Sequence, residues 1–175
     1  MKPFITVFVI ALSLQLSAQD FKGLDKSPLD IAAFPDSYRV SEKALRVVYS
    51  RPQLKGRDLN SLAPQGKVWR TGANETTEIT FFESLKFGST NIAPGTYALF
   101  TIPGADRWTI IINKAQNTWG AYSYDETLDV GRIEVPVTEA TDTVEALSMI
   151  FKEEGANIIL HIGWGNTRVA VPFSR

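Results

Sequence analysis

The sequence contains no cysteine and only one histidine, His161. Disulfide bonds and a lipid anchor on an N-terminal cysteine are therefore excluded. One histidine without cysteine cannot supply the ligands of a zinc site built from these two residue types. No closely spaced acidic loop suggests calcium either. We therefore expect no metal and no cofactor, and a fold that is stabilised by a hydrophobic core.

A strong charge of either sign is also missing, since 18 lysines and arginines oppose 19 aspartates and glutamates. Domains that bind nucleic acid carry a strong positive field. We therefore expect no nucleic-acid partner, although the balance is compatible with one local basic pocket.

Long apolar runs are confined to the N-terminus. Lys2 precedes an apolar segment over residues 4–16, and the small residues Ser17 and Ala18 come before a predicted cleavage at Gln19. The run is shorter than the roughly 20 apolar residues of a membrane-spanning helix. This pattern favours a signal peptide over residues 1–18, and an exported protein, periplasmic or extracellular, that has no contact with the membrane after cleavage.

No helix of ordinary length is indicated in the rest of the chain. Residues 19–37 show no sustained period and predict a linker or loosely docked N-terminal arm. From Tyr38 the chain consists of short β-rich runs separated by glycine, proline, asparagine and aspartate. We therefore expect one all-β domain over 38–175, an antiparallel β-sandwich of the jelly-roll kind, with a closed barrel as the alternative, and a monomer or weak homo-oligomer.

Short alternating or apolar runs give the individual strands and the core. The predicted strands are 45–50, 77–82, 85–87, 97–102, 108–112, 130–137, 144–151, 158–164 and 168–173. Gly165 and Asn166 predict a two-residue turn between the last two. The most apolar strands predict a buried core that contains Leu99, Phe100, Ile110, Ile112 and Leu160.

The polar residues that can carry a function concentrate in residues 49–77, YSRPQLKGRDLNSLAPQGKVWRTGANETT. The residues that we expect to bind a ligand there are Arg51, Lys55, Arg57, Trp69, Arg70, Asn74, Glu75 and Thr76. Arginine forks suit carboxylate or phosphate. Glu75, the only acid between Asp58 and Glu78, is the candidate catalytic acid or base.

Three interpretations of this segment remain open. The first is a non-catalytic binding or interaction domain whose Arg/Glu-lined pocket accepts an anionic or carbohydrate ligand, a small molecule or glycan of the envelope. The second is a hydrolase that uses Glu75, with Arg51, Arg57 and Arg70 as an anion clamp. The third is a structural envelope protein without a small-molecule site, in which Glu75 neutralises the arginines. All three predict Glu75 within ion-pair distance of one of these arginines.

Two further sets of residues are less specific. A single histidine on a strand, such as His161, predicts a packed or surface residue more than a catalyst, because a base needs an orienting partner. Trp108 fits the core pattern. Trp119, Tyr122 and Tyr124 lie in the irregular segment 113–127, where packing against the sheet is favoured over a sugar-stacking platform.

Five motifs occur in order along the chain: YSRPQLKGR, GKVWRTGANETT, PGTYALFTIPG, WGAYSYDETLDVGR and TRVAVPF. With these motifs the sequence resembles the bacterial domain of unknown function 2911 over about residues 27–173. The resemblance implies a secreted bacterial protein of a family without an established activity, and it supplies no catalytic residue. The chain departs from the family pattern after KGR, where DLNSLAPQG replaces an aromatic and glycines and Gln65 replaces a tyrosine before Gly66.

Overall fold

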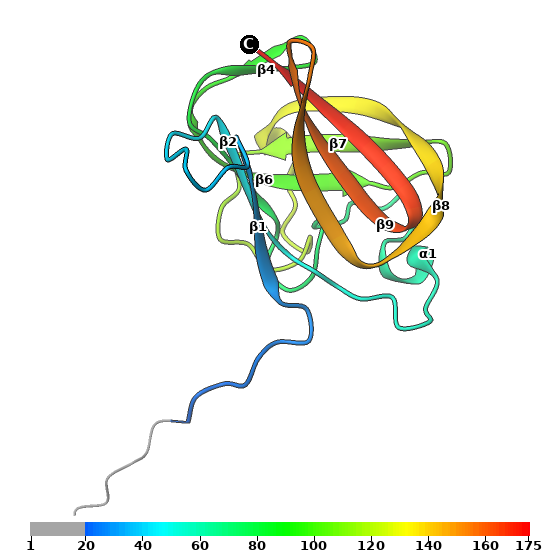
Figure 1. Ribbon diagram of the computed structural model, residues 1–175. Helices are drawn as coiled ribbons and strands as arrows, with labels where there is room; N and C mark the ends of the chain where they lie inside the picture. Colours follow the sequence, from blue (N-terminus) through cyan, green and yellow to red (C-terminus); the bar gives the residue numbers. More distant parts are fainter. Residues whose placement is uncertain (1–19) are drawn as a thin grey trace, which may run out of the picture.

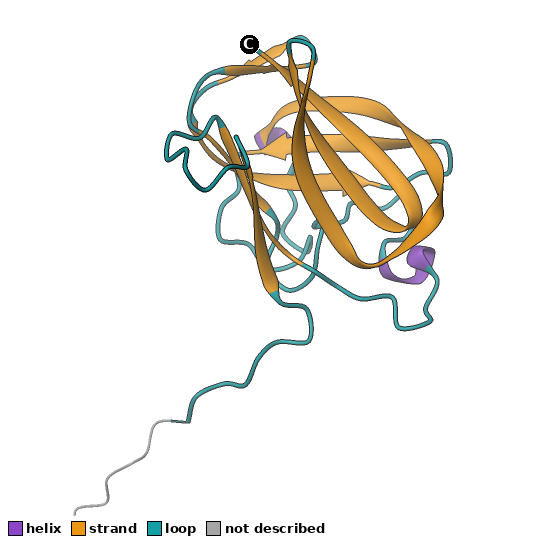
Figure 2. Cartoon of the chain, viewed as in Figure 1, coloured by secondary structure: helices purple, strands orange, loops and turns teal. Residues whose placement is uncertain are grey.

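The computed structural model describes residues 20–175, so the predicted signal peptide lies outside the described residues. The described chain is almost entirely β-structure (Figure 2). Nine strands form one antiparallel sheet in the order β1-β2-β3-β6-β7-β8-β9-β4-β5. The prediction of a single all-β antiparallel domain is confirmed. The alternative of a closed barrel is wrong, because β1 and β5 end the sheet without pairing with each other.

The elements have the following bounds. The strands are β1 (Leu29–Phe34), β2 (Leu45–Ser50), β3 (Glu78–Phe81), β4 (Leu85–Phe87), β5 (Thr90–Ile92), β6 (Gly95–Ile102), β7 (Arg107–Asn113), β8 (Asp129–Glu154) and β9 (Asn157–Ser174). Two short helical turns, α1 (Leu59–Leu62) and η1 (Glu126–Leu128), complete the chain.

The sheet forms two layers because β8 and β9 are long and bent. The β8–β9 part lies in front of β6 and β7 in Figure 1. The pairing of β8 with β9 shifts register between Glu139 and Val144, and again before Ser148. β9 bends at Gly165, whose positive φ of 57° suits glycine. Strand β8 pairs with β7 as well as with β9, so it connects the two layers.

Four of the predicted strands therefore form only two strands in the structure. Residues 130–137 and 144–151 both belong to β8, and residues 158–164 and 168–173 both belong to β9. The bend in β9 lies at the predicted Gly165–Asn166 turn. Its two arms are close together, because a Cβ on Gly163 would lie 3.3 Å from the Arg168 side chain. Pairing with β8 continues through the bend, which is why the chain remains one strand there.

Strand β1 lies inside the segment predicted as a linker. Every residue from Leu29 to Phe34 pairs with β2, ending in the pairs Leu29↔Ser50 and Phe34↔Leu45. Its apolar residues face both sides, since Ile31 is 59% exposed while Ala32 is buried. The alternation that marks a half-buried strand is therefore blurred. The sheet begins at Leu29, and residues 20–28 are the part of the described chain that precedes it.

The core lies between the two layers and contains a cluster of three tryptophan rings among aliphatic side chains. Trp69 stacks on Trp164 at 5.6 Å between ring centroids and meets Trp108 edge-on at 6.0 Å. The five predicted core residues are all buried, each at most 1% exposed. Four of them belong to this core, whereas Phe100 packs with Ala98 and Ile111 in a smaller second cluster.

No helix among residues 20–175 has both the length and the apolar character needed to cross a membrane.

Candidate functional site

The structure distributes the residues of segment 49–77 over separate places and does not gather them into one site. Trp69 is a core residue, only 4% exposed, and its indole N–H donates to the carbonyl of Gly72 at 3.1 Å. Its backbone pairs with Thr101 of β6. The assignment of Trp69 to ligand binding is therefore replaced by a role in packing.

Arg51 has a structural position. Its guanidinium forms an ion pair with Asp30 at 2.9 Å and donates to the carbonyl of Leu147 at 2.9 Å and to the hydroxyl of Ser148 at 2.7 Å. Asp30 lies on β1, and the other two partners lie on β8. Arg51 therefore fastens the first strand of the sheet to the strand that connects its layers.

The predicted ion pair of Glu75 with an arginine is wrong. Among the ion pairs of the described residues none involves Glu75, Arg57 or Arg70. The physical reason is the backbone between Arg70 and Glu75. Thr71 and Asn74 both adopt positive φ, 56° and 59°, and this turns the chain so that Glu75 pairs with Trp119.

Arg70 is half-buried, and within the described part of the chain its Nε atom is buried without a hydrogen-bond partner. Burial lowers the pKa of Arg70, and the nearby Tyr122 partly offsets this shift. Tyr122 itself is 88% exposed. Neither residue lines the pocket that contains Glu75.

Asn74, Glu75 and Thr76 line a pocket of about 510 Å³. We call it the Trp119 pocket. Its walls come from four segments, and the lining residues are Lys22, Gly23, Asp25, Ser27, Leu29, Val48, Tyr49, Ser50, Asn74, Glu75, Thr76, Glu78, Asn117, Thr118 and Trp119. Three of the eight predicted binding residues thus lie together in one concave site.

Hydrogen bonds between residues 74–76 and 118–120 fix this wall. The backbone N–H of Thr76 donates to Thr118 at 2.9 Å, and that of Gly120 donates to Asn74 at 3.0 Å. The Thr76 hydroxyl donates to the Gly120 carbonyl at 2.6 Å. Directly opposed residues of an antiparallel pair project to the same face. The bridge between Glu75 and Trp119 therefore sets a carboxylate beside an indole.

Trp119 is the exposed tryptophan of this protein. Its side chain is 60% accessible, whereas Trp69, Trp108 and Trp164 are at most 4% exposed. An exposed tryptophan beside hydrogen-bonding side chains offers a flat apolar surface to a ligand. The alternative of a ligand platform is thus supported for Trp119. Tyr124, by contrast, packs against Phe100 with ring centroids 5.0 Å apart.

The charge of the Trp119 pocket is negative, since one lysine, Lys22, faces the three acids Asp25, Glu75 and Glu78. Hydrogen bonds from the Ser27 backbone N–H and the Asn74 side chain lower the pKa of Asp25. Glu78 accepts a hydrogen bond from the backbone of Asn117 at 3.3 Å. This surface disfavours the anion that we expected beside Glu75.

The cationic residues of the KGR motif line a second pocket, of about 470 Å³. We call it the Arg57 pocket, and its lining residues are Lys26, Ser27, Gln53, Lys55 and Arg57. Ser27 lines both pockets. The sequence therefore identified residues of two neighbouring pockets of opposite charge but assigned them to one.

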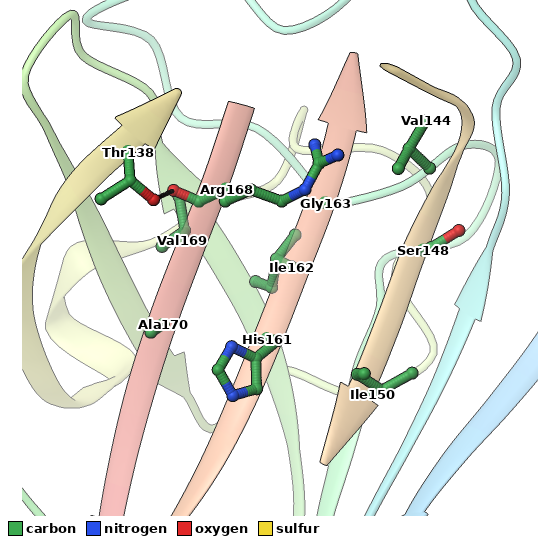
Figure 3. Close-up of a pocket in the computed structure, with 10 residues that line it drawn as sticks. All are labelled: Thr138, Val144, Ser148, Ile150, His161, Ile162, Gly163, Arg168, Val169 and Ala170. Atoms are coloured by element: carbon green, nitrogen blue, oxygen red, sulfur yellow. Dashed lines mark hydrogen bonds between the residues drawn. The ribbon is translucent and has the colours of Figure 1, made fainter. Parts of the chain in front are cut away.

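A third hollow, of about 380 Å³, lies on the β8–β9 part of the sheet and contains His161 (Figure 3). His161 contacts Glu154 through Nε2 at 3.1 Å. The Ser148 hydroxyl points away from His161 in Figure 3 and is hydrogen-bonded to Arg51 and to the Ala146 carbonyl. His161 therefore has an orienting acid but activates no nucleophile in this hollow.

Residues 22–27 were missed as part of the site. Lys22, Gly23, Asp25 and Ser27 line the Trp119 pocket, while Lys26 and Ser27 line the Arg57 pocket. The charges in KGLDKS are the one sequence feature of this segment, and they are equally typical of a linker. Over residues 20–175 no three histidine, aspartate or glutamate side chains gather closely enough to hold a metal ion.

Comparison with known proteins gives one result. The family described as "Protein of unknown function (DUF2911)" matches residues 34–173. The chain belongs to this family. No curated protein and no solved structure matches the chain. The family match begins at Phe34, so residues 22–27, which form one wall of both pockets, lie outside it.

Proposed function

We propose that this member of the DUF2911 family is an exported, non-catalytic domain that binds a glycan of the bacterial envelope in the Trp119 pocket. The observation that carries the proposal is the pairing of Glu75 with Trp119, which places a carboxylate and an exposed indole on the same face of one pocket.

This combination suits a sugar ring. One face of a sugar presents C–H groups, which pack against the electron-rich face of an indole. Its rim presents hydroxyl groups, which donate to carboxylates in charge-assisted hydrogen bonds. Asn74, which lines the same pocket, can both donate and accept. An inorganic anion would meet three acids there and gain little from the indole.

Binding is favoured over hydrolysis because the anion clamp of the hydrolase interpretation is not assembled. Arg51 is engaged with Asp30 and β8, Arg57 lines the other pocket, and Arg70 lines neither. The purely structural interpretation required a buried Glu75 neutralised by arginine, and Glu75 is exposed without an ion pair among the described residues.

The proposal is tested by calorimetric titration of the protein from Gln19 onward with short soluble oligosaccharides of glucose, N-acetylglucosamine and uronic acids. Trp119→Ala is expected to weaken binding about tenfold, equivalent to about 1.4 kcal/mol. Tyr38→Ala is the matched control, because Tyr38 is 88% exposed and lines none of the three pockets. Recovery of intact oligosaccharide after incubation distinguishes binding from hydrolysis. Equal affinity of Trp119→Ala and the parent protein would refute the proposal.

A further inference from the structure

The Trp119 pocket and the Arg57 pocket are neighbours that share residues 22–27 as a wall. Asp25 faces the first pocket, Lys26 faces the second, and Ser27 lines both. A ligand longer than one sugar ring that occupies the first pocket therefore has the second beside it.

The two pockets have opposite charge. The Trp119 pocket has three carboxylates against one lysine, whereas the Arg57 pocket has Lys26, Lys55 and Arg57 and no acid in its lining. Opposed fields of this kind favour one orientation of a ligand with an uneven charge and disfavour the reverse one.

Arg57 is held in place by its own turn. Its Nε donates to the Leu54 carbonyl at 2.9 Å and its Nη2 to the Gln53 carbonyl at 2.7 Å. Its backbone N–H also donates to Leu54, at 3.0 Å. These bonds fix the guanidinium and leave Nη1 without a hydrogen bond among the described residues. A guanidinium that is already ordered loses little freedom when it binds an anion.

The turn that carries Arg57 is itself attached to the sheet. Lys55 and Gly56 both have positive φ, 49° and 73°. The backbone N–H of Lys55 donates to the Glu145 carboxylate at 2.6 Å, and that of Leu54 donates to the Glu145 carbonyl at 3.0 Å. The Glu145 carboxylate is thereby engaged with the backbone and does not line the pocket.

The positive charges of the pocket have no counter-ion in the described part of the chain. Lys26, Lys55 and Arg57 take part in none of its ion pairs. Like charges around one hollow repel each other, and an anion between them relieves that repulsion. Backbone carbonyls orient Arg57 but carry no net charge. All three side chains are exposed, so a negative group of a ligand can reach them and replace the water around them.

We infer that the ligand is an acidic glycan whose ring lies on Trp119 and whose anionic substituent, a carboxylate or a phosphate, lies in the Arg57 pocket. This inference rests on the proposed function of the Trp119 pocket and adds the charge and the direction of the bound ligand. Lys26, Lys55 and Arg57 recognise the anionic group, and the acids of the Trp119 pocket exclude it from the other end.

The test compares three forms of one oligosaccharide of glucose: neutral, oxidised at C6 to the uronate, and esterified with phosphate. Calorimetric titration at low salt is expected to show that one or both acidic forms bind at least tenfold more tightly than the neutral form. The form with the higher affinity identifies the substituent. Added sodium chloride should weaken only the acidic forms, because it screens exposed charges.

The variant that tests the site is Lys55→Gln with Arg57→Gln. It should bring the affinity for the acidic forms down to that for the neutral form and leave the neutral form unaffected. Lys67→Gln with Lys152→Gln removes the same charge outside the three pockets and should change neither.

Three outcomes contradict the inference. If the neutral oligosaccharide binds, loses affinity in Trp119→Ala and binds as tightly as the acidic forms, the proposed function stands and the acidic ligand is refuted. If no form binds, both are refuted. Nuclear magnetic resonance of the backbone amides locates the anion, and shifts on adding the acidic form that spare residues 55–57 would contradict its placement in the Arg57 pocket.

Discussion

The backbones of Glu75 and Trp119 pair in an antiparallel bridge, so that the carboxylate and the indole project to the same face. The two residues are far apart in the sequence, and each lies in a segment without regular strand structure of its own. The pair connects the loop after Trp69 with the loop after β7. The two loops thus form one wall of the Trp119 pocket. On this wall the indole presents a flat apolar surface and the carboxylate presents a hydrogen-bond acceptor.

The close packing behind this wall predicts that Gly72→Ala is destabilising. A Cβ on Gly72 would lie 3.0 Å from the Thr77 hydroxyl and 3.1 Å from the Ser50 carbonyl. Overpacking of this kind costs about 1–3 kcal/mol, which urea unfolding measures. Gly23→Ala is the control, because a Cβ there meets nothing within 4 Å. Equal stability of the two variants would show that residues 71–77 are not held as described.

Glu75→Gln should change the free energy of unfolding by less than about 1 kcal/mol, because the exposed carboxylate forms no ion pair among the described residues. Oligosaccharide binding should weaken, since the amide cannot provide a charge-assisted acceptor. Urea unfolding and calorimetric titration of the same variant separate the two effects. A loss of about 3–5 kcal/mol, as expected for a broken buried ion pair, would restore the structural interpretation.

Substitution of Arg51 should lower the free energy of unfolding, whereas substitution of Arg57 should leave it almost unchanged. Arg51→Gln removes hydrogen bonds to Asp30, Leu147 and Ser148, which join β1 to β8, and a bond to a charged group contributes about 1.5–3 kcal/mol. The bonds of Arg57 stay within its own turn, so Arg57→Gln should cost less than about 1 kcal/mol. Urea unfolding of both variants checks the order, and the reverse order would contradict the assigned roles.

The raised pKa of Tyr124 predicts that the protein loses stability at alkaline pH. Burial, assisted by the hydrogen bond to Asp129, raises the pKa of Tyr124 to about 12, whereas an unfolded tyrosine has a pKa of about 10. The unfolded chain therefore loses its proton first. The contribution of Tyr124 is complete below about pH 10 and disappears as the pH rises to about 12. Thermal unfolding of the parent protein should show this decline relative to Tyr124→Phe, and parallel pH profiles would contradict it.

Much of the fold follows from local sequence. Runs such as residues 97–102 and 108–112 are apolar, end at glycine, proline or asparagine, and form β6 and β7 with only small changes of boundary. The continuity of β8 and β9 was not predictable in this way. It depends on pairing of each strand with the other through their bends, and this pairing connects residues as distant as Val137 and Val169.

The candidate site was predicted less well, because sequence proximity does not determine which way side chains point. Asn74, Glu75 and Thr76 were found from their polarity, and Lys55 and Arg57 from their charge. They lie in two pockets because the turn of Lys55 and Arg57 is attached to Glu145 of β8, whereas residues 74–76 pair with residues 118–120. Trp119 and residues 22–27 join the pocket through tertiary contacts, which the polar segment 49–77 does not indicate.

The most direct test of the central claim, a glycan stacked on Trp119, is acrylamide quenching of tryptophan fluorescence with and without oligosaccharide. The three buried tryptophans are at most 4% exposed, so collisional quenching reports mainly on Trp119. The account predicts that an acidic oligosaccharide protects the fluorescence of the parent protein and has no such effect on Trp119→Ala. Unchanged quenching at oligosaccharide concentrations that saturate binding in calorimetry would show that the ligand does not cover Trp119, and would contradict the account.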